Sequence, residues 1–157
     1  MHQGGAEAMN DIQLSKFLGW FSLGLGTLEL LASRRVAAKL GIGSPRLVQA
    51  FGAREIAAGF MVLNKPDTAM SVWGRVAGDA MDAAVLATRL GSGNPQRGGA
   101  KAALLFVLGA TALDMVVAAA LSRREQQALV TARRTRVQSR ATQTISAASL
   151  PQAVPVR

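Results

Sequence analysis

The chain has 157 residues, enough for one domain; half are hydrophobic and 17% are charged, against about 25% in an average soluble domain. Its formal net charge is +9, but no basic face is interleaved with stacking aromatics, so we predict no nucleic-acid partner. The absence of cysteine and the single histidine, His2, exclude disulfides, thiolate or His-rich metal sites and a Ser-His-Asp triad. Among metal sites only oxygen-ligand ones stay open, such as Asp79-x-x-Asp82, and we predict no metal and no cofactor.

The N-terminal part of the chain contains a polar lead and a first apolar segment. Residues 1–13 are small and polar, which predicts a disordered N-terminus. Leu14–Ala32 is apolar and close to the roughly 20 residues that a helix needs to cross a bilayer. Acidic residues precede it and no convincing cleavage site follows, so we expect a retained span rather than a signal peptide.

Three further apolar segments follow at regular intervals. The basic linker ends in Gly-Ser-Pro, a helix-start signal, before the second segment, Arg46–Asn64. An Asn-Lys-Pro-Asp turn joins it to Met70–Leu90, which predicts an antiparallel hairpin. A glycine-rich loop then leads to Lys101–Leu121. Together the segments predict an all-α fold, a four-helix transmembrane bundle over residues 14–121.

The charge distribution favours a membrane. If the three residues at each end of every segment are left out, the four segments contain two arginines and five acidic residues. All other residues of the chain, those segment ends included, contain sixteen basic and four acidic residues. Basic flanks suit a bilayer with anionic headgroups, so we expect the lipid bilayer as partner. Uncharged runs of about a dozen residues also fit a buried soluble helix, but a soluble helix needs a wider polar stripe. Basic residues balance on the two sides, so the orientation is not assigned.

Residues 122–157 form a basic tail that we predict to be helical at first and then disordered. Small, polar and proline residues at its end are typical of disorder. The tail is either a solvated flank that fixes topology or a polybasic segment that binds anionic lipid. The composition favours the first interpretation.

Ionisable residues within the segments are the main functional candidates. A charge at the centre of a membrane helix costs about 2.5–3.5 kcal/mol on insertion scales, so it should face protein or water. Arg75, Asp79 and Asp82 are spaced to share one helix face. The predicted charged network comprises Glu29, Arg54, Glu55, Arg75, Asp79, Asp82 and Asp114.

Two neighbouring features accompany this network. Arg54 and Glu55 are adjacent and point about 100° apart on a helix, so we expect them to serve different neighbours. Glycines at interfaces let helices approach closely, and Gly74 with Gly78 forms a GxxxG pair. The predicted helix-packing glycines are Gly52, Gly59, Gly74 and Gly78.

The network allows two interpretations. One is a proton- or cation-handling path or a polar substrate site; the other is an Arg–carboxylate lock that fixes helix register. Catalytic motifs are weak: Gly78-Asp79 resembles the dipeptide of intramembrane aspartyl proteases, but the chain has no tyrosine for the partner motif. We predict no catalytic residue, and an intramembrane enzyme stays open only as a third class with little support from the sequence.

Three stretches carry a family resemblance. FGAREIAAG (Phe51–Gly59) and RVAGDAMD (Arg75–Asp82), preceded by GWFSLGLGTLELLA (Gly19–Ala32), resemble the membrane region of bacterial proteins labelled "cyclase/dehydrase". The resemblance covers about Lys16–Leu121 and implies a bacterial inner-membrane location and shared charged positions at Glu29, Arg54, Glu55, Arg75, Asp79 and Asp82. In that family a soluble START-like domain often follows. The 36 residues after Leu121 are too few for it, so we carry over no cyclase or dehydrase activity.

The sequence therefore predicts a multi-pass inner-membrane protein that acts as a binding or accessory component. The alternative is a small proton- or cation-coupled transporter or channel. A homo-oligomer and a membrane-protein partner both stay open.

Overall fold

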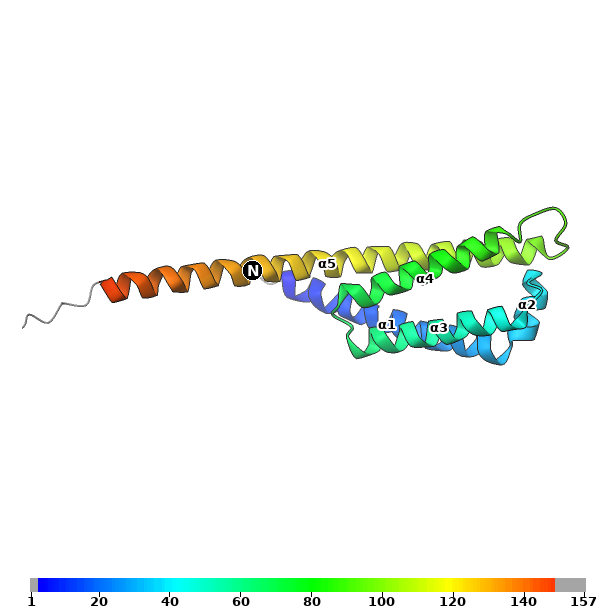
Figure 1. Ribbon diagram of the computed structural model, residues 1–157, viewed down its shortest axis with the longest axis horizontal. Helices are drawn as coiled ribbons and strands as arrows, with labels where there is room; N and C mark the ends of the chain where they lie inside the picture. The colour runs from blue at the N-terminus through cyan, green and yellow to red at the C-terminus, as the bar shows by residue number, and fades with distance from the viewer. Residues whose placement is uncertain (1–2, 149–157) are drawn as a thin grey trace, which may run out of the picture. The chain divides into compact units, whose positions relative to one another are not determined.

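A computed structural model describes the backbone of residues 3–148 and the side chains of residues 10–143. Every secondary-structure element in this range is a helix, which confirms the predicted all-α class (Figure 1). The helices are α1 (Gln3–Leu31), α2 (Ser33–Leu40), α3 (Pro45–Asn64), α4 (Ala69–Ala87) and α5 (Arg97–Ala148).

The chain divides into two compact units, Met1–Ser122 and Arg123–Arg157. The first unit contains α1 to α4 and the part of α5 that ends at Ser122. In the second unit α5 continues to Ala148, and almost all side chains described there are exposed. The predicted helical start of the basic tail thus continues to Ala148, and residues 149–157, where the predicted disorder would lie, are outside the described range.

The predicted disordered N-terminus is largely helical, because α1 begins at Gln3. Residues 3–13 include alanine, glutamate, methionine and glutamine, which favour helices, and no proline interrupts them before Leu14. Polarity alone predicted disorder here, whereas the helix propensity of these residues favours the observed helix.

The helix α2 was not predicted, since its residues were assigned to a basic linker. It is short and amphipathic: Ala37 is buried, while Arg34, Arg35 and Lys39 are exposed. The helix ends at Leu40, and Gly41 follows it with a φ of 66°, in the left-handed region that favours glycine. Its basic face made the segment look like a loop, although its apolar residues are at helical spacing.

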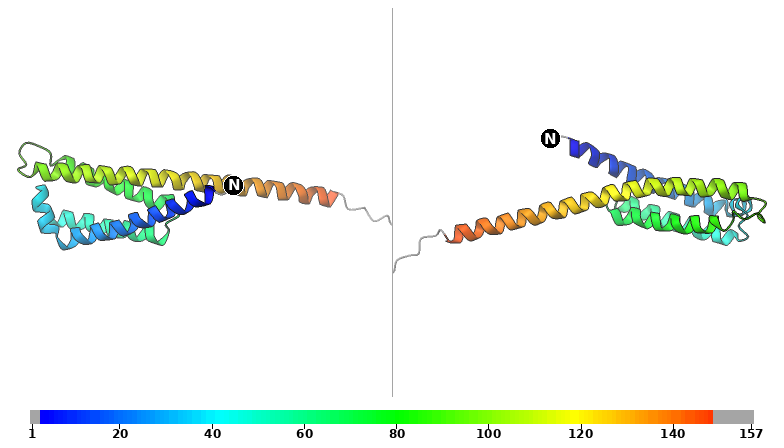
Figure 2. Two further views of the ribbon diagram at one scale, coloured as in Figure 1. Left: turned by 180° about the vertical axis from the view of Figure 1, so that it is seen from behind. Right: turned by 90° about the horizontal axis from the view of Figure 1, so that it is seen from above.

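The helices α1 and α3 form the most extensive pair in the bundle and lie side by side (Figures 1 and 2). A Cβ atom at Gly26 would lie 2.5 Å from the carbonyl oxygen of Gly52, and one at Gly59 would lie 2.7 Å from that of Gly19. These four glycines, which we call the glycine seam, allow the two backbones to touch.

The helices α3 and α4 are consecutive and connected by residues 65–68, in agreement with the predicted hairpin. Two apolar clusters fill the bundle. One joins α1, α3, α4 and α5 through Leu18, Val62, Ala69, Val72, Val117, Ala118 and Leu121. The other joins α2, the following loop and the start of α3 through Ala37, Ile42 and Val48.

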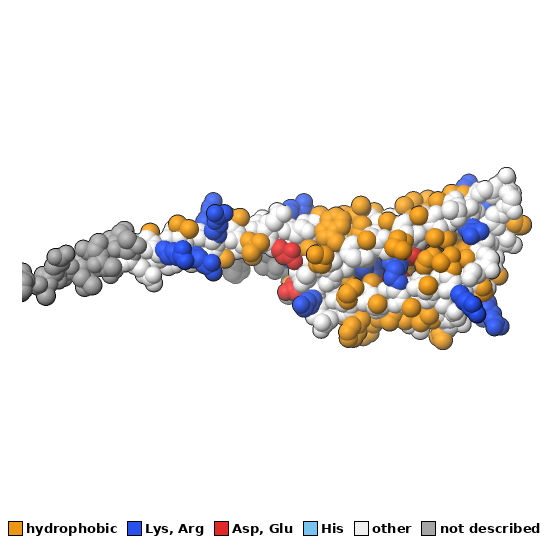
Figure 3. All heavy atoms as spheres, in the orientation of Figure 1, with side chains coloured by type: hydrophobic (Ala, Val, Ile, Leu, Met, Phe, Trp, Pro, Cys, Tyr) orange, Lys and Arg blue, Asp and Glu red, His pale blue; other side chains and the backbone are white. Residues whose placement is uncertain are grey.

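Large apolar side chains cover much of the outer surface of the bundle. Trp20 and Phe60 are each 67% exposed and Leu105 is 71% exposed. On the face of the bundle that Figure 3 shows, apolar side chains cover much of the surface and basic side chains lie mainly toward the ends. Among the described helices, α5 is long and apolar enough by itself to cross a membrane, within Arg97–Gln143.

Candidate functional site

A continuous chain of ion pairs joins α3, α4 and α5. Arg54 Nη2 lies 2.6 Å from Asp82 Oδ2 and 3.2 Å from Glu55 Oε1. The other carboxylate oxygen of Glu55, Oε2, lies 3.2 Å from Arg75 Nη1. Arg75 then reaches α5, because its Nη2 lies 3.0 Å from Asp114 Oδ2. Glu55 therefore links the two arginines.

The groups in the middle of this chain are withdrawn from the surface. Arg75 is 1% exposed, Glu55 2% and Asp114 fully buried. Buried charges are tolerated only when they are paired and hydrogen-bonded. Arg75 meets this condition, since its Nε also donates a hydrogen bond of 3.1 Å to Asp114 Oδ2.

The angular separation of Arg54 and Glu55 predicted that they bind different neighbouring helices. This prediction is wrong. Arg54 binds Asp82 and Glu55 binds Arg75, and both partners are on α4. The long side chain of Arg54 bends back toward the bundle interior over Gly78, where a Cβ atom would overlap the guanidinium group. Gly78 thus makes room for an arginine side chain rather than for a helix backbone.

The other predicted packing glycines have different surroundings. Gly52 and Gly59 lie in the glycine seam. Gly74 is exposed, and no neighbouring atom lies within 4 Å of the place where its Cβ would be. No contact among the described residues therefore supports the packing role that we predicted for Gly74. The GxxxG spacing was misleading because α4 bridges to its neighbours through side chains.

The small residues of α1 were missed as a packing surface. Ser15 and Ser22 are fully buried, and they alternate with Gly19 and Gly26 along one face of the helix. The pattern Ser-x3-Gly-x2-Ser-x3-Gly repeats small residues at helical spacing and could have revealed this face.

Two acids of the predicted network have no arginine partner in the described part of the chain. Asp79 lies 3.3 Å from the Thr111 hydroxyl oxygen, which also lies 2.8 Å from the Val107 carbonyl oxygen. Glu29 is half-buried, and its Oε2 is enclosed without a hydrogen-bond donor. Thr111 was not predicted, although it lies one helical turn before Asp114.

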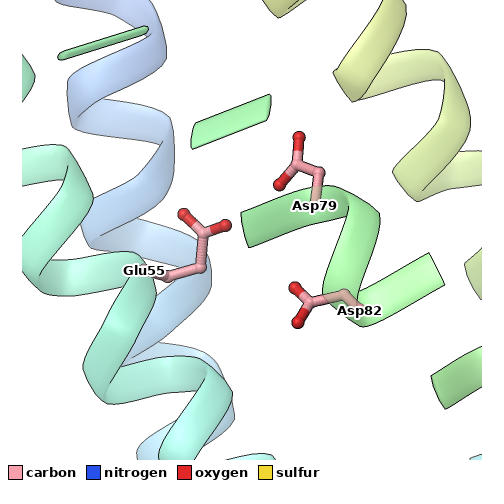
Figure 4. A group of neighbouring side chains, drawn as sticks. All are labelled: Glu55, Asp79 and Asp82. Carbon is pink, nitrogen blue, oxygen red and sulfur yellow. The ribbon is translucent and has the colours of Figure 1, made fainter. Parts of the chain in front are cut away.

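Three of the acids converge between α3 and α4. Carboxylate oxygens of Glu55, Asp79 and Asp82 lie within 4.8 Å of one another, and the side chains point toward a common space (Figure 4). Oxygen clusters of this kind suit hard cations. Arginines already form ion pairs with Glu55 and Asp82, however, which disfavours a bound cation. That the chain binds no metal stays a prediction.

A cavity of about 210 Å³ adjoins these acids. Its walls are largely apolar and come from all five helices and the loop after α2, and its charged lining residues are Glu29, Glu55, Arg75, Asp79 and Asp82. The volume exceeds the roughly 150 Å³ of an engineered protein cavity that admits benzene. The site therefore combines an apolar chamber with a group of partly unpaired carboxylates, a combination suited to small-molecule binding.

No protein-family model matches the chain, and comparisons with curated proteins and with solved structures find no significant match. The resemblance to the membrane region of "cyclase/dehydrase" proteins therefore rests on its three sequence stretches and stays a prediction.

Proposed function

We propose that this chain is a multi-pass membrane protein in which α1, α3, α4 and the first unit's part of α5 cross the bilayer. The reversed polarity of the bundle carries this proposal. Arg75, Glu55 and Asp114 are buried inside it, whereas large apolar side chains such as Trp20 and Phe60 are exposed outside. In water both halves of this arrangement cost free energy; in lipid, ionisable groups belong in the bundle interior and apolar groups on its surface.

Charged residues lower the hydropathy of α3 and α4, and pairing offsets the cost of placing most of them inside a bundle. Each contains three charged residues, so neither stands out as a span from composition alone. Arg54, Glu55, Arg75 and Asp82 pair with one another or with Asp114. Both helices are also of membrane-crossing length, at 20 and 19 residues.

The cavity supports a binding or accessory role. Its apolar walls and few polar groups are typical of sites that hold a small molecule. The ion pairs around it join three helices and therefore fix its shape. We infer that the bundle holds a ligand, or presents one to a partner protein, without changing it chemically.

A proton- or cation-coupled transporter is the second candidate. It is favoured by Glu29 and Asp79, acids at the cavity that the described ion pairs leave without arginine partners. Free carboxylates inside a membrane bundle are characteristic of proton and cation paths. If this alternative holds, neutralising Asp79 with Asp79→Asn will abolish flux into proteoliposomes.

Two steps test the proposal in the native membrane. Washing membranes at alkaline pH releases peripheral proteins, so the tagged chain should stay in the pellet; its release would contradict membrane insertion. Purification in mild detergent, with mass spectrometry and native sizing, then separates the functions. A partner at fixed stoichiometry supports the accessory role, whereas a lone homo-oligomer that conducts ions in liposomes supports transport.

A further inference from the structure

The cavity has two chemically distinct parts. Phe21 and Leu25 from α1, Phe51 from α3 and Phe106 from α5 contribute to an apolar wall. Glu29 and Asp79 contribute carboxylates to the same chamber. A ligand that fills it must satisfy both parts, because apolar walls gain free energy only from an apolar body and carboxylates only from a donor or a cation.

The charges around the cavity are unbalanced. Five acids and two arginines form the network, so the acids outnumber the arginines by three. Two carboxyl oxygens next to the cavity, Glu29 Oε2 and Asp82 Oδ1, are enclosed and receive no hydrogen bond from the residues that the structure describes. Asp82 as a whole is only 8% exposed, so water reaches it poorly. The cavity thus offers carboxyl oxygens without matching donors from the described part of the chain.

We propose that the cavity binds a small organic cation, an ammonium group attached to a compact apolar body, with the carboxyl groups of Glu29 and Asp82 as its acceptors. An ammonium group brings up to three N–H donors to the unfilled oxygens. A hydrated metal ion would gain nothing from the apolar wall, and an anion would be repelled by the excess carboxylates. A neutral apolar molecule would leave Glu29 Oε2 and Asp82 Oδ1 without donors.

The size of the cavity limits the ligand to about one ring with a short arm. At about 210 Å³ it is larger than the roughly 150 Å³ that accommodates benzene. Benzylamine, protonated at neutral pH, therefore fits as a probe. Benzyl alcohol has nearly the same shape without the charge, and the difference between the two isolates the contribution of the carboxylates.

The test measures binding of each probe to the purified full chain in mild detergent by isothermal titration calorimetry. We expect benzylamine to bind at least tenfold more tightly than benzyl alcohol. Equal affinities, or no binding of benzylamine, would overturn the proposal. The inference rests on the proposed function only for its membrane setting. Release of the chain by alkaline washing would therefore refute the membrane proposal and leave this affinity ratio as a separate result.

Variants locate the binding. Glu29→Gln and Asp82→Asn should each weaken benzylamine binding at least tenfold and leave benzyl alcohol unaffected. Ala110→Leu adds volume at the cavity wall and should abolish binding of both probes. Asp67→Asn, at an exposed acid between α3 and α4, is the matched control and should bind like the parent.

Size-exclusion profiles report whether each variant folds. If Asp82→Asn does not, Glu29→Gln decides, because Glu29 is only half-buried and has no ion pair to lose among those described. Unchanged benzylamine binding in a folded Glu29→Gln variant would contradict the assignment of Glu29, and unchanged binding in Ala110→Leu would exclude the cavity.

Discussion

Two interfaces of α3 are built in different ways. Toward α1, the glycine seam brings backbone against backbone, and Gly52 and Gly26 leave no room for a side chain. Toward α4, the connection is made by long charged side chains, Arg54 to Asp82 and Glu55 to Arg75. The first interface is closed by the smallest residue, whereas the second is held open by some of the largest.

The difference explains where the cavity lies. Backbone contact fills the space between two helices, while bridging side chains hold helices apart and leave volume between them. Glu55 belongs to both interfaces: its Cβ lies next to Gly26, and its carboxylate reaches α4. A rigid pair, α1 and α3, thus supports a wider region in which charged groups surround a chamber.

The largest loss of stability is expected from removing Arg75, the buried arginine at the interface between α3 and α4. Arg75→Ala leaves Asp114 buried without its ion-pair partner and leaves Glu55 paired with Arg54 alone, which costs about 3–5 kcal/mol for a broken buried pair. Thermal unfolding in detergent should show a large loss of stability or no folded protein. Arg46→Ala, at an exposed position of the same helical bundle, is the control. An unchanged unfolding midpoint for Arg75→Ala would rule out a structural role for the ion pairs.

Enlarging a glycine of the seam should have the next largest effect. In Gly26→Ala the new methyl group meets the Gly52 carbonyl oxygen, a backbone atom that cannot turn away, so α1 and α3 must separate at about 1–3 kcal/mol. Gly24→Ala, two residues earlier, meets no atom within 4 Å and serves as control. The comparison between the interfaces fails if the two variants unfold at the same temperature.

A smaller loss is expected at Gly78 on α4. The methyl group of Gly78→Ala displaces the Arg54 guanidinium, which is the movable end of a side chain. The cost is therefore mainly the weakened ion pair with Asp82, about 1–2 kcal/mol as an overpacked site that relaxes in part. Gly74→Ala, on the same helix with open space around it, should be neutral. Equal losses in both variants would show that α4 packs as the GxxxG spacing suggested.

The smallest effect is expected for Thr111→Val, which removes the hydroxyl beside Asp79 and keeps the side-chain shape. Loss of one hydrogen bond costs about 1 kcal/mol. Thr27→Val removes a hydroxyl that bonds the Leu23 carbonyl oxygen at an exposed site, and this control should stay closer to the parent. If thermal unfolding does not separate the two, Thr111 contributes no more than a surface threonine.

The helices and the central charged residues could be predicted from the sequence to different extents. Apolar length and turn residues placed the start of α3 within one residue and its end at Asn64. The charged positions of α3 and α4 were recognised because charges are rare in apolar segments. The partners of Arg54 could not be derived from helical angles, since its side chain is long enough to reach Asp82 across Gly78.

Other features depend on information that a single helix does not contain. Whether a glycine faces a neighbouring backbone, as Gly52 does, or open space, as Gly74 does, is decided by the approach of a second helix. The cavity likewise arises from the separation of several helices, and no local pattern predicts it. The start of α1 at Gln3 was not predicted for a simpler reason, because the polarity of residues 3–13 was taken as a sign of disorder.

The side of the membrane on which each loop lies tests the central claim most directly. The chain has no cysteine, so single cysteines at Gly43→Cys, Asp67→Cys and Ser92→Cys, all exposed, can be labelled with a membrane-impermeant maleimide in intact and in permeabilised cells. Four membrane-crossing helices predict that the Gly43 and Ser92 positions share one side and the Asp67 position lies on the other. Labelling of all three from the same side would contradict the membrane bundle.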